Sequence, residues 1–251
     1  MRTFAATGVA AAVLVPLELA MRRVSAKNRP AMPWLFHRAL ARSLGIRVIV
    51  RGRQARRGGV LIVANHLSWA DIPVLGSRIM AAFVAKSEVA AWGPVGWLST
   101  LSRTVYVDRE RRLATGAARN AIAERLAARE NVILFPEGTN SDGVAVLPFK
   151  SALFAAIEGP GCEDFLIQPV TLAYTRLNGL TITRELLPEI AWIGDTELVP
   201  HALAFMSLGK VRAEIYFHPP VRIIDFADRK ALARHCHDVI ADEYRRLMRG
   251  D

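Results

Sequence analysis

The sequence predicts an α/β fold in which a mixed, largely parallel sheet is flanked by helices. Short apolar runs rich in β-branched residues, such as Val60 to Ala64 and Val132 to Phe135, are typical of buried strands. Segments with the helical spacing of apolar residues lie between such runs, for example Arg111 to Arg129. Strands that alternate with helices indicate βαβ units, whose strands run parallel.

The chain begins with an apolar segment. Phe4 to Met21 is apolar apart from Thr7 and Glu18, and a helix of this length would span about 27 Å, slightly less than the ~30 Å hydrocarbon core of a bilayer. A cleaved signal peptide with Arg2 at its charged start is the alternative. The basic cluster from Arg22 to Arg29 favours a retained, membrane-associated helix with the rest of the chain at the cytoplasmic face of the inner membrane.

Residues 33 to 45 interleave Trp34, Leu35 and Leu40 with basic residues. This pattern is typical of a basic amphipathic helix on a membrane surface, and equally of a helix that packs onto the domain. No repeat or interdomain linker follows. We therefore expect residues 1–45 to form a membrane anchor and amphipathic helix, and residues 46–251 to form one domain.

Strands and helices alternate through the rest of the chain. The other predicted strands are Ile46 to Arg51, Phe83 to Ala85, Thr104 to Val107, Phe165 to Ala173, Leu180 to Thr183 and Val211 to Phe217. The other predicted helices are Asp71 to Met80, Ser151 to Ile157, Pro200 to Leu208 and Asp228 to Met248.

Composition limits the partners of the chain. It is 52% hydrophobic and carries a formal net charge of +10, which favours acidic partners. The sequence has no zinc-finger spacing, RNP-like motif or basic heptad region, so we expect no nucleic-acid partner. Anionic membrane lipids fit better, because the chain is also apolar. Cys162 and Cys236 lack metal-ligand spacing, so we expect reduced thiols and no metal site.

The chemistry is expected at the corner after the strand Val60 to Ala64. His66 follows this strand, and Asp71 lies five positions later. Five steps along one helix rotate about 140°, so the two side chains meet only if the backbone bends between them. A carboxylate that binds one imidazole nitrogen leaves the other as a general base. The alternative is structural, because Ser68 and Asp71 also match a capping box.

Four segments resemble the motifs of the glycerolipid acyltransferase family, which includes the 1-acylglycerol-3-phosphate acyltransferases. NHLSWAD (65–71) and FPEGT (135–139) are similar to its first and third motifs. TVYVDR (104–109) and LIQPV (166–170) are similar to the second and fourth. All occur in family order, which makes the resemblance far more specific than one motif would.

The resemblance implies a glycerol-3-phosphate acyltransferase-like fold and transfer of a fatty acyl group from acyl-CoA or acyl carrier protein to the hydroxyl of a lysolipid. His66 would take the hydroxyl proton and Asp71 would steady the imidazolium. Backbone amides of the Glu-Gly-Thr turn, or of the corner after Asn65, would bind the oxyanion. The chemistry needs no further cofactor. A Gly-x-Ser-x-Gly elbow is absent, which argues against an α/β-hydrolase.

Basic residues and the third motif are the candidates for binding the headgroup of the acyl acceptor. Arg109 matches the arginine of the second motif. Glu137 has two interpretations, direct contact with the acceptor or pairing with Arg109 to hold the loop. The full set of acceptor-binding candidates is Arg103, Arg109, Glu137, Gly138, Thr139 and Lys150.

One position departs from the family pattern. Many relatives with glycerophosphate acceptors continue the third motif with Arg-Ser, whereas this chain has Asn140. The runs VAKSEVAAWGPVGWL and EGTNSDG also resemble the lyso-ornithine lipid acyltransferases, whose acceptor has an amino-acid headgroup. Because Arg103, Arg109 and Arg111 still supply positive charge, we expect 1-acylglycerol-3-phosphate as acceptor, giving phosphatidic acid. The alternatives are lyso-ornithine lipid acylation and an inactive lipid-binding relative.

Overall fold

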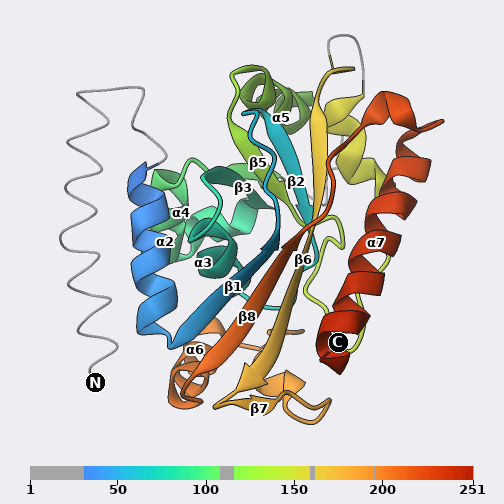
Figure 1. The fold of residues 1–251 in the computed structure, drawn as a ribbon. Coiled ribbons are helices and arrows are strands. Elements are labelled where there is room, and N and C mark those ends of the chain that lie inside the picture. Colours follow the sequence, from blue (N-terminus) through green and yellow to red (C-terminus); the bar gives the residue numbers. More distant parts are fainter. Residues whose placement is uncertain (1–30, 108–115, 159–161, 195, 251) are drawn as a thin grey trace.

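The computed structural model describes residues 31–107, 116–158, 162–194 and 196–250. Within these ranges one nine-stranded sheet forms the centre, with the strand order β1-β8-β6-β2-β5-β3-β4 and with β7 and β9 paired to β6 (Figure 1). The predicted α/β class and largely parallel sheet are therefore confirmed. The predicted helix over Phe4 to Met21 lies outside the described residues.

The elements follow the alternation that the sequence predicts. The strands are β1 (Ile46–Gly52), β2 (Val60–Ala64), β3 (Ala81–Lys86), β4 (Val105–Val107), β5 (Asn131–Leu134), β6 (Leu166–Leu177), β7 (Leu180–Thr181), β8 (Val211–Phe217) and β9 (Val221–Arg222). The α-helices are α2 (Ala31–Ser43), α3 (Asp71–Gly76), α4 (Gly93–Leu101), α5 (Gly116–Ala127), α6 (Leu198–Ser207) and α7 (Arg229–Arg249). Short 3₁₀ helices are η2 (Ser87–Ala91), η3 (Ser151–Ile157), η4 (Leu187–Glu189) and η5 (Ile223–Asp225).

The parallel part of the sheet contains β6, β2, β5, β3 and β4. β8 runs antiparallel to β6 and parallel to β1, which makes the sheet mixed. Every residue of β2 is buried, as a continuous apolar run in a central parallel strand predicts. Val63 of β2 pairs with Leu134 of β5, so the loops that leave these two strands begin side by side at the carboxyl edge of the sheet.

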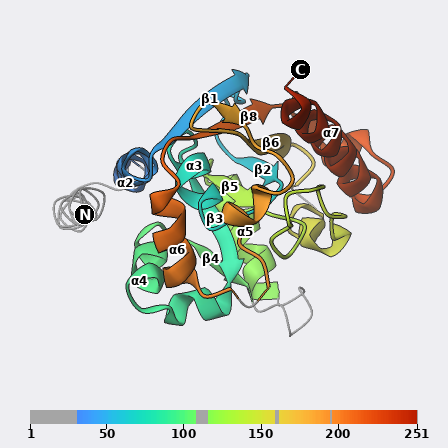
Figure 2. The same ribbon diagram turned by 90° about the horizontal axis from the view of Figure 1, so that it is seen from below.

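Helices cover both faces of the sheet. α7 lies along β6 on one face, while α2 and α3 lie on the other (Figure 2). α2 packs onto α3, and His37 and Ala41 on this side of α2 are buried. Of the two interpretations of this segment, packing onto the domain is therefore observed. No helix in the described part of the chain combines the length and the apolarity that a membrane span requires.

Several elements differ from the prediction in extent or kind, or were not expected. The helix predicted from Asp71 to Met80 ends at Gly76, because the chain turns into β3 at Ala81, two residues before the predicted strand. The segment Ser151–Ile157 forms a 3₁₀ helix and not an α-helix. The run from Gly93 to Leu101, for which no regular structure was expected, forms α4.

Candidate active site

His66 and Asp71 meet in the turn between β2 and α3. β2 ends at Ala64 and α3 begins at Asp71, so the chain bends between the two residues. Nδ1 of His66 lies 2.7 Å from Oδ2 of Asp71. A carboxylate only accepts hydrogen bonds, so Nδ1 carries the proton and donates it. The structure thus brings together the two residues that the sequence predicts as the catalytic pair.

Asp71 is fully buried and its oxygens accept several hydrogen bonds. Oδ2 also accepts from the amides of Leu67, at 2.7 Å, and Ser68, at 2.9 Å. Oδ1 accepts from the hydroxyl of Tyr174 on β6 at 2.8 Å. These amides precede α3, and Ala70 caps the helix without a side-chain hydrogen bond. The bond from the amide of Ser68 to Asp71 is one of the two hydrogen bonds of a capping box, so the structural interpretation of Asp71 holds beside its contact with His66.

The imidazole of His66 is held on two sides. Its ring stacks on the ring of Phe135 with a centroid distance of 4.1 Å and an interplanar angle of 14°. Nδ1 is occupied by Asp71, and Nε2 has no hydrogen-bond partner among the described residues. The side chain of His66 is 16% exposed to solvent. The ring is therefore fixed in orientation with Nε2 left unpaired, which is the arrangement that a general base requires.

Glu137 joins the two loops at this edge of the sheet. It is 1% exposed, its Oε1 accepts from the amide of His66 at 2.7 Å, and its Oε2 accepts from the amide of Leu147 at 2.9 Å. Burial raises the pKa of Glu137 to about 8, since it outweighs the two amide donors that lower it. Both oxygens bind backbone, so the described contacts support the loop-holding interpretation of this residue.

Gly138 and Lys150 are neighbours in the third-motif turn. Gly138 has a φ of +73°, and a Cβ at this position would lie 2.8 Å from Nζ of Lys150. The amide of Lys150 donates to the carbonyl of Pro136 at 2.8 Å. Thr139 is exposed. The amide of Ser141 donates to the carbonyl of His66 at 2.8 Å, which fixes the turn beside the catalytic pair.

Three backbone amides of the corner are not available for an oxyanion. Those of His66, Leu67 and Ser68 all donate to carboxylates. The side chain of Asn65 is used as well, because it donates to the carbonyl of Leu172 and accepts from its amide, both at 2.8 Å. The turn of the third motif is therefore the better source of hydrogen-bond donors for the oxyanion. It is one of the two alternatives that the sequence left open.

Asn140 places an unused donor in that turn. Its Nδ2 is buried and has no hydrogen-bond partner within the described ranges. The backbone amides of Thr139 and Asn140 donate to no described acceptor either. A buried amide nitrogen without a partner is costly to leave unsatisfied. This turn therefore has donors that a bound substrate can use.

Arg103 lies away from this edge of the sheet. It precedes β4, and its guanidinium is 2.5 Å from the carboxylate of Glu130, which precedes β5. Arg125 binds the same carboxylate at 3.2 Å. Arg103 and Glu130 lie at the amino ends of parallel strands, whereas His66 follows a carboxyl end. Arg109 and Arg111 lie outside the described residues.

Tyr174 belongs to the site and was not among the sequence candidates. Its side chain is fully buried, and its hydroxyl reaches Asp71 across 103 positions of sequence. It sits inside a long apolar strand, where a tyrosine is ordinary. Only the pairing of β6 with β2 brings it to the catalytic pair.

The chain is similar to known acyltransferases. A model of the acyltransferase family matches residues 23–173. The chain is 41% identical over 225 residues to the lyso-ornithine lipid O-acyltransferase of Brucella abortus, covering 88% of this chain and 84% of the relative. It is 30% identical over 194 residues to the 1-acyl-sn-glycerol-3-phosphate acyltransferase of Neisseria gonorrhoeae, covering 77% and 71%.

The fold is also similar to a solved structure. The crystal structure of the 1-acyl-sn-glycerophosphate acyltransferase PlsC from Thermotoga maritima matches with a TM-score of 0.70 at 22% identity, over 98% of both chains. At 22% identity, this similarity shows a shared fold, that is, the same arrangement of helices and strands.

Proposed function

The chain belongs to the acyltransferase family and is an acyltransferase of lysolipids, and we propose which lysolipid it uses. The proposed acyl acceptor is a lyso-ornithine lipid. The observation that carries the proposal is Asn140, whose buried Nδ2 has no partner within the described residues. An amino-acid headgroup carries both a carboxylate and an ammonium. The neutral carboxamide of Asn140 can donate a hydrogen bond to that carboxylate without adding positive charge beside the ammonium. Arginine suits phosphate better, because its fork binds two phosphate oxygens.

Sequence similarity also favours lyso-ornithine lipid over 1-acylglycerol-3-phosphate as the acceptor. The Brucella lyso-ornithine lipid enzyme is 41% identical to the chain, against 30% for the Neisseria enzyme named for 1-acylglycerol-3-phosphate. This reverses the order expected from the motifs, which placed 1-acylglycerol-3-phosphate first. The phosphate acceptor stays the second candidate, because the ammonium of Lys150 lies against Gly138 in the same turn.

The proposed reaction is a direct acyl transfer. Nε2 of His66 takes the proton of the acceptor hydroxyl as its oxygen attacks the thioester carbonyl. Asp71 stabilises the imidazolium, and the amides of Thr139 and Asn140 bind the oxyanion. Collapse of the tetrahedral intermediate expels the thiolate, which takes the proton back from His66. The acyl donor is acyl-CoA or acyl carrier protein, and no other cofactor takes part.

The place of action is part of the proposal. The acceptor is a membrane lipid, and the formal net charge of +10 suits the anionic cytoplasmic leaflet. The enzyme therefore works at the cytoplasmic face of the inner membrane, on lysolipid from that leaflet.

A panel of acceptors tests the proposal. Purified protein in mixed micelles receives labelled acyl-CoA with lyso-ornithine lipid, with 1-acylglycerol-3-phosphate, or with neither; H66A is the blank, and a second series uses acyl carrier protein as donor. We expect kcat/KM for lyso-ornithine lipid to exceed that for the phosphate acceptor about tenfold or more. We expect H66A to lose about 10² to 10⁴ of kcat. A preference for 1-acylglycerol-3-phosphate would make the second candidate correct.

Two variants at position 140 link the preference to the residue. N140R adds a phosphate-binding fork and is expected to lower the ratio of lyso-ornithine to phosphate acceptor use about tenfold. N140Q keeps the carboxamide and is the matched control, with the preference of the wild type. An unchanged ratio in N140R would remove Asn140 from headgroup selection.

A further inference from the structure

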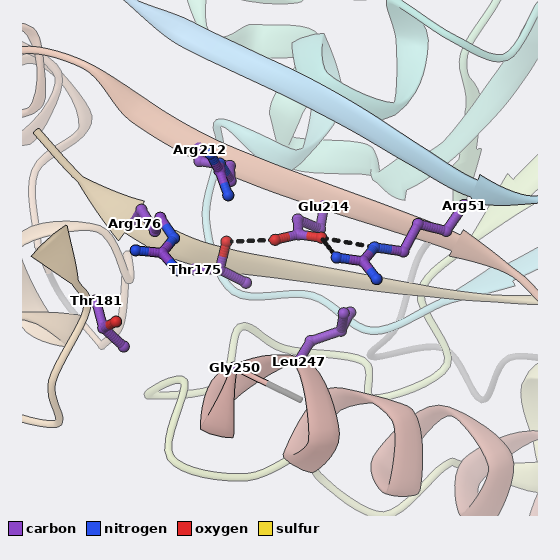
Figure 3. Close-up of a pocket in the computed structure, with 8 residues that line it drawn as sticks. All are labelled: Arg51, Thr175, Arg176, Thr181, Arg212, Glu214, Leu247 and Gly250. Carbon is purple, nitrogen blue, oxygen red and sulfur yellow. Dashed lines mark hydrogen bonds and ion pairs between the residues drawn. The ribbon is translucent and has the colours of Figure 1, made fainter. Parts of the chain in front are cut away.

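Arginines on three neighbouring strands lie in one row across the sheet. In the registers of β1 with β8 and of β8 with β6, Arg212 pairs with Arg47 on one side and with Arg176 on the other. Directly paired residues share a face of the sheet, and like charges in such pairs destabilise it. Arg176 and Arg212 line a pocket whose volume is about 60 Å³ (Figure 3). The row therefore needs negative charge from elsewhere.

A bulge in β6 contributes to this pocket. The register of β6 with β8 shifts between Tyr174 and Arg176, so Thr175 is an additional residue. Successive residues of a regular strand point to opposite faces, but here Thr175 and Arg176 both line the pocket (Figure 3). Tyr174 instead donates to Asp71. Bulges redirect side chains in this way, often beside functional sites.

Glu214, the acidic residue that lines the pocket, already has partners. Nε and Nη2 of Arg51 each lie 2.9 Å from Oε2 of Glu214, and the hydroxyl of Thr175 donates to its Oε1 at 2.8 Å (Figure 3). Glu214 therefore neutralises Arg51. Within the described residues the guanidinium of Arg212 has no hydrogen bond or ion pair, and that of Arg176 donates only to the carbonyl of Gly179, at 3.1 Å.

The end of α7 does not balance the remaining charge. Leu247 and Gly250, at its carboxyl end, line the pocket. A helix carboxyl terminus is equivalent to roughly half a negative charge, whereas Arg176 and Arg212 each carry a full positive charge. Among the described residues that line it, the pocket therefore keeps a net positive charge, with two guanidinium forks beside the hydroxyl of Thr181.

We propose that this pocket binds a phosphate group. Guanidinium forks match phosphate oxygens, and a threonine hydroxyl adds a further donor. The pocket lies across β6 from the catalytic pair, because Tyr174 leaves β6 toward Asp71 and the bulge turns Thr175 and Arg176 away from it. The ligand is therefore distinct from the headgroup bound at His66. Free phosphate, CoA and an anionic phospholipid are its three sources.

Binding to the full-length protein tests the proposal and identifies the source. The probes are inorganic phosphate, CoA, and vesicles of phosphatidylcholine with or without phosphatidylglycerol. R176Q and R212Q are compared with R57Q, a matched loss of charge at an exposed arginine before β2. We expect at least one probe to bind R176Q and R212Q about tenfold or more weakly than the wild type and R57Q. CoA bound only at the catalytic site would show no such difference.

Thermal unfolding separates this role from a structural one. In phosphate-free buffer we expect R212Q to unfold at the temperature of the wild type or above, because it loses a like-charge contact. The effective probe raises the midpoint of the wild type and of R57Q but not that of R212Q. The proposal is overturned if no probe distinguishes R212Q from R57Q, or if R212Q is less stable than the wild type without any probe.

Discussion

At the scale of single residues, Asp71 organises the site. It accepts from Nδ1 of His66, from the amides of Leu67 and Ser68, and from the hydroxyl of Tyr174. These donors hold the carboxylate in one orientation, and the carboxylate in turn holds the imidazole. In the proposed mechanism this orients His66 before substrate binds, so the base reaches its proton without a reorientation step.

Tyr174 is a positioning residue, and Y174F tests this. The variant removes one donor from Asp71, so the carboxylate attracts the imidazole proton more strongly. We expect kcat to fall about tenfold, in line with the loss of a hydrogen bond to a charged group, and the acidic limb of the kcat/KM profile to move to higher pH.

Y244F is the control for that variant. Tyr244 is also a buried tyrosine, but its hydroxyl donates to the carbonyl of Gly143 and not to Asp71. Y244F is therefore expected to leave the acidic limb in place. Identical pH profiles for Y174F and the wild type would show that Tyr174 only fills space.

At the scale of elements, the contact of α2 with α3 contains a buried histidine. Neither ring nitrogen of His37 has a hydrogen bond in the described structure, and a Cβ on Gly76 would lie 2.5 Å from its ring. Burial lowers the pKa of His37 from 6.5 to about 4. Between about pH 4 and pH 6.5, His37 is therefore protonated in the unfolded chain but neutral in the folded chain. The contact of α2 with α3 loses stability as the pH falls through this range.

H37L removes this pH dependence. Between pH 7 and pH 5 the wild type is expected to lose about 2 kcal/mol of unfolding free energy through His37, from the linkage of proton binding to folding. Urea unfolding at the two pH values measures the loss, which should be smaller by that amount in H37L. H237L, at a partly exposed histidine on α7, is the control. Equal losses in H37L and the wild type would contradict the assignment.

At the scale of the whole molecule, the sheet separates three charged sites. The catalytic pair lies at the carboxyl end of β2, and the arginine pocket lies across β6 from it. The ion pair of Arg103 with Glu130 lies at the amino edge, where it joins the starts of β4 and β5. Basic residues therefore serve different purposes at different edges, and only their place in the sheet distinguishes them.

The net charge of +10 predicts how the full chain binds membranes. Co-sedimentation is expected to be stronger with vesicles that contain phosphatidylglycerol than with phosphatidylcholine alone. The difference should shrink as salt rises from 0.01 M to 1 M, because the screening length falls from about 30 to 3 Å. Equal binding to both vesicles at low salt would show that charge plays no part in membrane association.

Local patterns in the sequence were sufficient for much of the fold. β2 and β5 follow from continuous apolar runs, and the turns after them follow from polar residues and Pro136. His66 and Asp71 were predictable because both lie in one such turn. Their contact required only a local bend, which five positions of sequence determine.

The tertiary structure decided what depends on pairing between distant strands. Tyr174 reaches Asp71 only because β6 lies beside β2. Arg103 looked like a ligand beside the second motif, but the start of β4 lies at the opposite edge of the sheet. The sequence by itself determined the candidate residues for the chemistry, because polar residues follow the ends of its apolar runs. The register of the strands decided which of them meet, because register depends on contacts between segments that no local pattern links.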